Sequence, residues 1–203
     1  MRAKSLWPCR SWPHGTPSQP APSLLLAARL TEAKGIALTP QALEAAEAQG
    51  LAVALDIIGA GPLAPQVQAL AARLRVVRLR LLDPVQYGAA FFCLLRGYHP
   101  ALVPSVSGEQ PRILFDAFGQ PVPVIASDTA GHRAAVVPGE TGLRFAPGDA
   151  GALLAALALA QAAPEVLRSM GRTAQDRVAG QTHRAMHLTR ARTLVEVLAP
   201  ATD

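Results

Sequence analysis

The residues of this sequence best suited to binding a ligand lie in a polar loop and in the helix predicted to follow it. The loop contains Gly108 and Glu109, and Asp116 belongs to the apolar segment ILFDAF. Pro111 suits the first position of that helix, so free backbone N–H groups should lie beside both acids. Such N–H groups and the helix dipole favour phosphate, while carboxylates accept hydrogen bonds from sugar hydroxyls. The pattern therefore predicts a site for a ligand that is both anionic and rich in hydroxyl groups.

Short apolar segments alternate with helical patterns on both sides of this loop, and they must position it. A continuous apolar run between two turns is typical of a strand buried in a parallel sheet. We expect such strands at 24–28, 51–58, 76–82, 101–105 and 123–126. Helical patterns follow at 39–49 with Thr39 as the N-cap, at 63–74, at 87–96 and from 111 onward. The alternation predicts an α/β protein with a Rossmann-like parallel sheet that has helices on both faces.

The second part of the sequence is mainly helical. A helical turn and a short strand at 143–145 precede Asp149, which is a good N-cap for an alanine-leucine helix. Pro164 begins another helix, and a last helix covers 183–198. These patterns predict a helical C-terminal tail.

The 203 residues are enough for one domain with short extensions. Prolines recur through residues 1–22 among serine and glycine, and they exclude a helix or a central strand there. We therefore expect a disordered or poorly ordered head at 1–22, one domain at 23–198 and a short tail at 199–203.

The composition excludes several classes of protein. The net charge is +5, but no basic stripe interleaved with aromatic residues is present, so we expect no nucleic-acid partner. No apolar run approaches the roughly 20 residues of a membrane span, so we expect no transmembrane segment. Cys9 and Cys93 lack a CxxC or histidine-paired spacing, and no metal site is predicted. These observations indicate a soluble cytoplasmic protein, with peripheral contact at a membrane left open.

Four segments carry a resemblance to a known family. In order along the chain they are AARLTEAKG (27–35), DIIGAGPL (56–63), PSVSGEQPRILFDAFGQPVPVIASD (104–128) and GETGLRFAPGD (139–149). They resemble the donor half of family 4 retaining glycosyltransferases, or glycosyl transferases group 1, over about residues 24–198. The resemblance implies the C-terminal half of a GT-B enzyme of hexosyltransferase type. Such a Rossmann-like domain binds a nucleotide-diphosphate-sugar donor and needs neither a metal nor another cofactor.

The resemblance also implies roles for individual residues. It places Arg29 and Lys34 on the donor diphosphate, where two cations would neutralise the leaving group. It assigns Asp116 to the second of two family acids, near the ribose hydroxyls. The first family acid falls on Gly108, and Glu109 follows one place later, so the approach of Glu109 to the sugar differs from the family pattern.

The predicted catalytic residues are thus Glu109, Arg29 and Lys34. The predicted donor-binding residues are Arg29, Lys34, Gly59, Gly61, Gly108, Glu109, Arg112 and Asp116.

The GAGP turn also has an alternative interpretation, because GAGPLA after an apolar strand is close to the pattern of a dinucleotide-binding fingerprint. The turn follows the second strand rather than the first, however, and prolines crowd the start of the next helix. An NAD- or FAD-binding oxidoreductase domain is therefore the less favoured alternative. We expect Gly59 and Gly61 either to let backbone approach the donor or simply to form a tight turn. His132 and Arg133 follow the turn at Ala130 and Gly131, near the ends of strands where ligands of open α/β sheets gather, but a lone histidine in a loop is usually just a loop residue.

The sequence predicts a glycosyltransferase that moves a sugar from a nucleotide-sugar to an acceptor with retention of configuration. The acceptor, whether a sugar, a lipid or a small molecule, is not specified. The alternative is a truncated, non-catalytic half that binds a nucleotide or a partner chain, because GT-B enzymes hold the acceptor on an N-terminal domain that residues 1–22 are too few to form. An acceptor-domain partner chain would supply that part.

Overall fold

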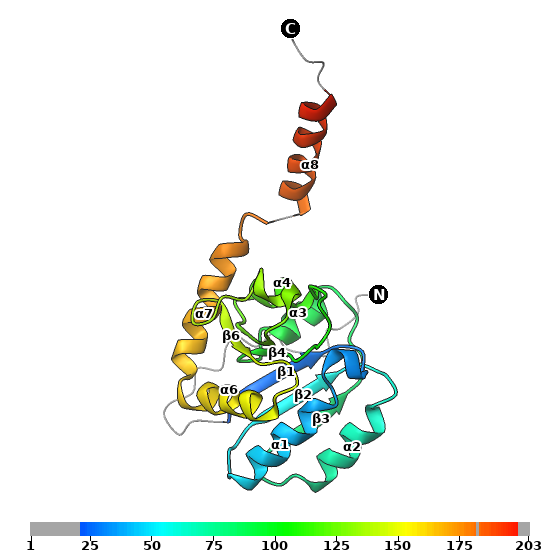
Figure 1. The fold of residues 1–203 in the computed structure, drawn as a ribbon, viewed down its shortest axis with the longest axis vertical. Coiled ribbons are helices and arrows are strands. Elements are labelled where there is room, and N and C mark those ends of the chain that lie inside the picture. Colours follow the sequence, from blue (N-terminus) through cyan, green and yellow to red (C-terminus); the bar gives the residue numbers. More distant parts are fainter. Residues whose placement is uncertain (1–20, 182, 199–203) are drawn as a thin grey trace, which may run out of the picture.

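The computed structural model describes residues 21–181 and 183–198. Most of the predicted head at 1–22 and the tail at 199–203 lie outside the described residues. Six parallel strands form one sheet in the order β3-β2-β1-β4-β5-β6 (Figure 1). The strands are β1 Ser23–Ala27, β2 Ala54–Ile58, β3 Arg78–Leu82, β4 Ala101–Val103, β5 Val124–Ser127 and β6 Gly142–Phe145. This order confirms the predicted Rossmann-like fold.

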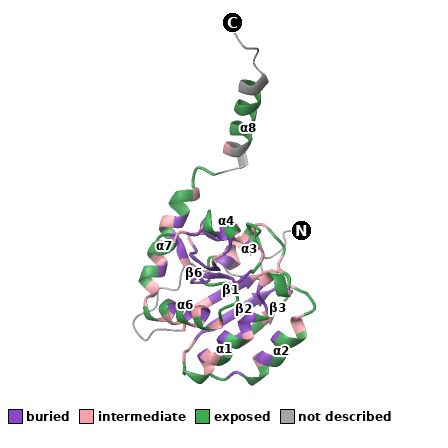
Figure 2. Cartoon of the chain, viewed as in Figure 1, coloured by how far each residue is buried: buried purple, intermediate pink, exposed green. Residues whose placement is uncertain are grey.

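Helices cover both faces of the sheet, as predicted. One core is shared by the sheet with α1, α2 and α6, the other by the sheet with α3 and α4, and α7 contributes to both. The α-helices are α1 Leu38–Ala48, α2 Ala64–Arg73, α3 Ala89–Leu95, α4 Ile113–Phe118, α5 Ala130–Arg133, α6 Ala150–Ala162, α7 Pro164–Val178 and α8 His183–Leu198, and η1 Glu32–Lys34 is a 3-10 helix. Figure 2 shows the buried residues gathered in the sheet and on the inner faces of these helices.

The continuous apolar character of the strands follows from this two-sided cover. Leu24 and Leu26 of β1 belong to one core, while Leu25 between them belongs to the other. All three are almost fully buried, because successive side chains of a strand point to opposite faces. The edge strand β3 instead alternates, with Arg78 and Arg80 exposed on either side of buried Leu79.

One acid interrupts the buried strand β2. Asp56 accepts hydrogen bonds from Arg80 at 2.8 and 2.6 Å and from the Tyr98 hydroxyl at 2.8 Å. Burial alone would raise the pKa of Asp56, but the bonds from Arg80 and Tyr98 outweigh it and lower the pKa. Asp56 is thus accounted for as a paired structural charge.

Two predicted helix starts are wrong, while those at Asp149 and Pro164 are confirmed. Helix α1 begins at Leu38, before the predicted N-cap, and Thr39 Oγ1 donates to the carbonyl of Gly35 from inside the first turn. Helix α4 begins at Ile113, so Pro111 precedes the helix rather than occupying its first position. Asp149 does cap α6, since its carboxylate accepts a hydrogen bond from the Ala152 N–H at 2.9 Å.

The helical C-terminal tail is confirmed, and α8 projects away from the sheet in Figure 1. Its exposed large apolar residues are Leu188, Leu194 and Val195. In the described chain, no single helix has the length and apolar character of a membrane span; α6 and α7 meet the criterion only as a pair bent by 99°.

Candidate functional site

A cavity of about 300 Å³ opens at the carboxyl ends of β1, β2 and β4. The order of the strands reverses between β1 and β4, and in open α/β sheets ligands bind at this switch point. Backbone and apolar side chains form most of the wall. The polar side chains that line it are Lys34, Tyr87, Ser105, Arg112 and Asp116.

Part of the cavity wall is a cluster around Asp116, on α4, which we call the Asp116 end. The Tyr87 hydroxyl donates to Asp116 Oδ1 at 2.8 Å, and Arg112 Nε lies 3.7 Å from Oδ2. The Arg112 guanidinium also stacks on the Tyr87 ring, 4.1 Å from its centroid. Burial raises the pKa of the Asp116 carboxyl, although Tyr87 and Arg112 act in the opposite direction. The cluster presents an aromatic ring, a guanidinium and a partly buried carboxylate to one ligand space.

Lys34, which also lines the cavity, pairs with Glu109, which does not, across 75 positions of sequence; we call this pair the Lys34 end. Lys34 Nζ donates to Glu109 Oε2 at 3.0 Å, and the Glu109 side chain is 74% exposed while that of Lys34 is 25% exposed. Lys34 is therefore the fixed member of the pair, and Glu109 lies at the solvent side.

Close backbone contacts position Lys34. Gly35, which follows it, has φ 72°, and a Cβ there would fall 1.9 Å from the carbonyl oxygen of Pro104. Ala33 accepts hydrogen bonds from Ser105 Oγ at 2.9 Å and from the Val106 N–H at 3.1 Å. The loops after β1 and β4 are thus tied together at the switch point, and only glycine fits where they touch.

Arg29 is exposed directly after β1, and the GAGP turn supports its loop. The Leu30 N–H donates to the Ala60 carbonyl at 2.9 Å, and a Cβ on Gly59 would fall 1.9 Å from the Ala28 carbonyl oxygen. Gly61 lies against Leu30 in the same way. Both glycines contact the β1 loop, while Ile58 supplies the wall of the cavity at β2.

The loop that carries Gly108 and Glu109 rests on α5. A Cβ on Gly131 would fall 2.2 Å from the Glu109 carbonyl oxygen and 2.5 Å from that of Gly108. Gly108 itself has open space, with no atom within 4 Å of a Cβ built on it. The structure therefore brings Lys34, Arg112, Asp116 and Glu109 to one edge of the sheet. Gly108 lies beside Glu109 in the same loop.

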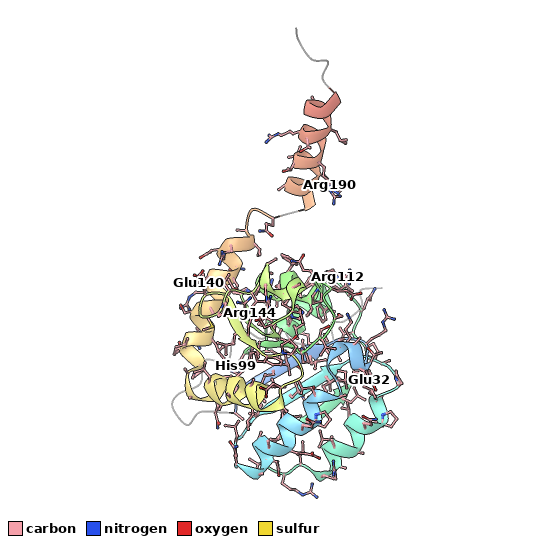
Figure 3. The ribbon with its side chains drawn as sticks, viewed as in Figure 1. Glu32, His99, Arg112, Glu140, Arg144 and Arg190 are labelled. Carbon is pink, nitrogen blue, oxygen red and sulfur yellow. The ribbon has the colours of Figure 1, made fainter. Side chains whose placement is uncertain are left out.

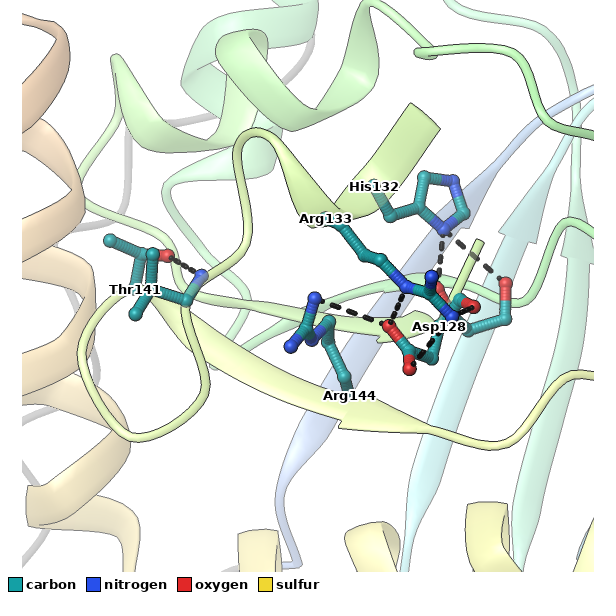
Figure 4. A network of polar contacts seen from close by, with 7 residues as sticks. Asp128, His132, Arg133, Thr141 and Arg144 are labelled. Carbon is teal, nitrogen blue, oxygen red and sulfur yellow. Dashed lines mark hydrogen bonds and ion pairs between the residues drawn. The ribbon is translucent and has the colours of Figure 1, made fainter. Parts of the chain in front are cut away.

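His132 is a residue that the sequence interpretation missed, because it was expected in a loop. It lies on α5 and is fully buried, and its Nδ1 is 2.7 Å from the Ser127 carbonyl oxygen (Figure 4). Ser127 Oγ in turn donates to the Ser105 carbonyl, which joins α5 to the β4 loop. Burial lowers the pKa of His132, so the imidazole is neutral near pH 7.

A second charged cluster lies next to His132 at the end of β5. Asp128 accepts from Arg133 Nε at 3.0 Å, and Arg144 Nη1 lies 3.2 Å from the same carboxylate oxygen (Figure 4). These bonds hold the pKa of Asp128 below its usual value. The cluster fastens β5 to β6 at the edge that carries the site.

Tyr87 and Ser105 were also missed as site residues. Both follow strands of the sheet at its carboxyl edge, and that position is the one signal by which the sequence could have shown them. Within the described residues, no three His, Cys, Asp or Glu side chains lie close enough together to hold a metal ion.

Comparison with known proteins gives a family for this chain and a set of structures with a similar fold. Residues 21–162 match the family model of glycosyl transferases group 1. No curated protein sequence matches the chain. A sucrose-phosphate synthase from Thermosynechococcus elongatus superposes with a TM-score of 0.73 at 24% identity, over 89% of this chain and 46% of that one.

Two further solved structures are similar. HepE from Anabaena in complex with UDP has a TM-score of 0.72 at 19% identity, over 87% of this chain and 49% of that one. The pneumococcal O-GlcNAc transferase GtfA in complex with UDP and GlcNAc has a TM-score of 0.70 at 20% identity, over 87% and 36% of the two chains. The likenesses show the Rossmann-like fold of a GT-B C-terminal half, and the chain spans less than half the length of each of these three proteins. Since the family model covers most of the sequence, the chain belongs to the glycosyl transferases of group 1.

Proposed function

We propose that this chain is the donor-binding half of a retaining, metal-independent glycosyltransferase of family 4. The observation that carries the proposal is a cavity at the switch point that is lined both by Lys34, which pairs with Glu109, and by Asp116. A cation at one end and a carboxylate at the other match the diphosphate and the ribose of a nucleotide-sugar.

The nucleoside occupies the end with the Asp116 cluster. Ribose hydroxyls donate to the Asp116 carboxylate, and the stacked Tyr87 and Arg112 side chains provide a flat surface beside it. The diphosphate lies toward Lys34, with exposed Arg29 as the second cation. HepE and GtfA were solved with UDP, which is the kind of ligand that this arrangement fits.

The chemical step requires positive charge where the glycosidic bond breaks. Negative charge develops on the departing diphosphate, and the positive charges of Lys34 and Arg29 stabilise it. A diphosphate that takes the Lys34 ammonium competes with Glu109 for it. The released Glu109 carboxylate then accepts a hydrogen bond from a hydroxyl of the sugar.

The acceptor side of the enzyme belongs to a partner in this proposal. The chain covers 36% to 49% of three similar proteins, and the apolar side chains of α8 are exposed. We propose an acceptor-domain partner chain that covers α8, an acceptor that is a sugar, a lipid or a small molecule, and a cytoplasmic location with at most peripheral contact at a membrane.

A half-domain that binds a nucleotide but catalyses nothing alone is the second candidate. Gly108 favours it, because glycine stands where the family has its first acid. The NAD- or FAD-binding alternative is not favoured, because the GAGP turn follows β2, whereas a dinucleotide fingerprint follows the first strand.

Calorimetric titration with UDP, GDP, UDP-glucose, GDP-mannose and NADH tests the proposal, together with an assay for donor hydrolysis. We expect one of the nucleotide pairs to bind with micromolar affinity and NADH not to bind. Binding with hydrolysis supports the transferase, and binding without it supports the second candidate. Binding of NADH alone would reject both.

A further inference from the structure

The side chain of His132 has one nitrogen whose hydrogen-bonding capacity is not used. Nδ1 lies 2.7 Å from the Ser127 carbonyl oxygen, which has only lone pairs, so Nδ1 must carry the proton and donate it. The neutral ring then has a bare lone pair on Nε2, the nitrogen of His132 from which no dashed line runs in Figure 4. Nε2 is buried and has no hydrogen-bond partner within the part of the chain that the structure describes.

The surroundings of His132 belong to the site edge. The preceding residue, Gly131, supports the backbone of Gly108 and Glu109. The charge of Lys34 reaches the imidazole and, after the larger effect of burial, helps to lower its pKa. The ring is thus linked through Ser127 to the loop after β4, and the residue before it packs on the backbone of the loop that carries Glu109.

An unpaired buried acceptor is costly, by about 1–3 kcal/mol. Nearly all such atoms in folded proteins have a partner, so an exception at a ligand-binding edge calls for one. A phosphate oxygen is excluded, because it too offers only lone pairs. A hydroxyl group, which has a proton to donate, is the complementary partner.

We propose that Nε2 of His132 accepts a hydrogen bond from a hydroxyl group of the sugar on the donor, and so positions that sugar. The inference rests on the proposed function. When the diphosphate takes Lys34, the ion pair that holds the Glu109 side chain breaks at little cost. In this proposal the backbone that packs on Gly131 then shifts away from α5. The hydroxyl then reaches Nε2.

Two substitutions test the roles of Nδ1 and Nε2 of His132 separately. His132→Asn keeps an amide N–H near the position of Nδ1, for the bond to Ser127, but has no atom at the position of Nε2. His132→Gln places its amide oxygen near the position of Nε2. Calorimetry with UDP and UDP-glucose, and with GDP and GDP-mannose, should show about tenfold weaker binding of the nucleotide-sugar to His132→Asn and unchanged binding of the nucleotide. His132→Gln should recover part of the loss.

His99→Asn is the matched control. His99 is also buried, but its Nδ1 accepts from the Ser23 N–H at the amino end of β1, away from Arg112 in Figure 3. The His99→Asn variant should bind both the nucleotide and the nucleotide-sugar with the affinity of the wild type. Equal affinity of wild type and His132→Asn for the nucleotide-sugar would overturn the inference alone. A wild-type chain that binds none of the four probes would overturn the proposed function, and the inference with it.

A measurement on the wild-type chain covers the case in which the variants do not fold. Long-range proton–nitrogen NMR spectra of ¹⁵N-histidine-labelled protein should show Nδ1 protonated and Nε2 bare at pH 7. Adding UDP-glucose or GDP-mannose should shift the Nε2 resonance of His132, while UDP or GDP should not. A protonated Nε2, or the same shift with the nucleotide alone, would contradict the inference.

Discussion

The two ends of the cavity are built differently. At the Asp116 end, an aromatic ring, a guanidinium and a carboxylate contact one another and line the space together. At the Lys34 end, the cation is neutralised by Glu109, an exposed residue on a polar loop, and a buried imidazole nitrogen nearby has no partner among the described residues.

This difference separates binding from catalysis. A preformed pocket loses little conformational freedom when it binds, so the Asp116 end should hold a nucleoside without rearrangement. The Lys34 end must exchange an internal ion pair for bonds to the diphosphate and the sugar. The structure thus supports nucleotide binding more directly than sugar transfer, and the substitutions below test each end.

The largest expected effect is a loss of stability in a variant of the GAGP turn, which supports the loop after β1. Gly59→Ala places a Cβ 1.9 Å from the Ala28 carbonyl oxygen at a φ of 154°, so the loop that carries Arg29 must shift. We expect a loss of about 3 kcal/mol in the free energy of unfolding, measured by urea denaturation.

Gly108→Ala is the control for Gly59→Ala, since no atom lies within 4 Å of its Cβ. It should change the free energy of unfolding by less than about 0.5 kcal/mol. Equal stability of the two variants would show that the GAGP turn does not support the Arg29 loop.

Lys34→Ala should weaken binding of UDP or GDP by about 30-fold, or about 2 kcal/mol, because a charged hydrogen bond to the diphosphate is lost. Calorimetry with the free nucleoside should show no change, since the nucleoside is proposed to bind the Asp116 cluster, of which Lys34 is not a member. Arg29→Ala should act in the same direction.

Arg73→Ala is a suitable control for the two cation substitutions, because Arg73 forms a comparable exposed ion pair with Glu44 on α1. It should leave nucleotide affinity unchanged. Equal losses of nucleoside and nucleotide affinity in Lys34→Ala would remove the distinction between the two ends.

Asp116→Asn should weaken binding of the free nucleoside by about tenfold, because a neutral amide accepts less strongly from ribose hydroxyls. Burial raises the pKa of Asp116, so the wild-type carboxylate takes up its proton at a higher pH than an ordinary aspartate. Nucleoside affinity should therefore fall as the pH is lowered from 7, and the fall should be absent in Asp116→Asn. A nucleoside affinity of the wild type that does not change with pH would place Asp116 outside the binding site.

The raised pKa of Asp116 also affects stability. The folded state binds the proton of Asp116 more tightly than the unfolded state does, so the contribution of this group to the free energy of unfolding falls as pH rises through the range above 3.8.

The fold could be predicted well because it depends on local pattern. The buried strands have continuous apolar runs, and Asp149 caps α6 through a residue three positions away. The starts of α1 and α4 were less predictable, since Thr39 and Pro111 suit a first turn by type, but contacts elsewhere decide where the helix begins.

The site could be predicted only in part. The resemblance selected Lys34 and Glu109, and the structure adds that they bond to each other, a contact over 75 positions that no local pattern contains. Tyr87 meets Asp116 over 29 positions, and the burial of His132 depends on packing against several loops. Such partners become visible only when the strands are brought side by side.

Glu109→Gln is expected to have the smallest effect on nucleotide affinity, and the direction of that effect is informative. The amide cannot neutralise Lys34, so UDP or GDP should bind about threefold more tightly, by roughly 0.6 kcal/mol, as fits the loss of one exposed ion pair. Donor hydrolysis should fall in the same variant, because the carboxylate that accepts from the sugar hydroxyl is gone. Tighter nucleotide binding with slower hydrolysis can arise only if Glu109 contacts Lys34 before the donor binds and the sugar afterwards. Weaker nucleotide binding would instead make Glu109 a donor-binding residue from the start, and the two ends of the cavity would then be equally preformed.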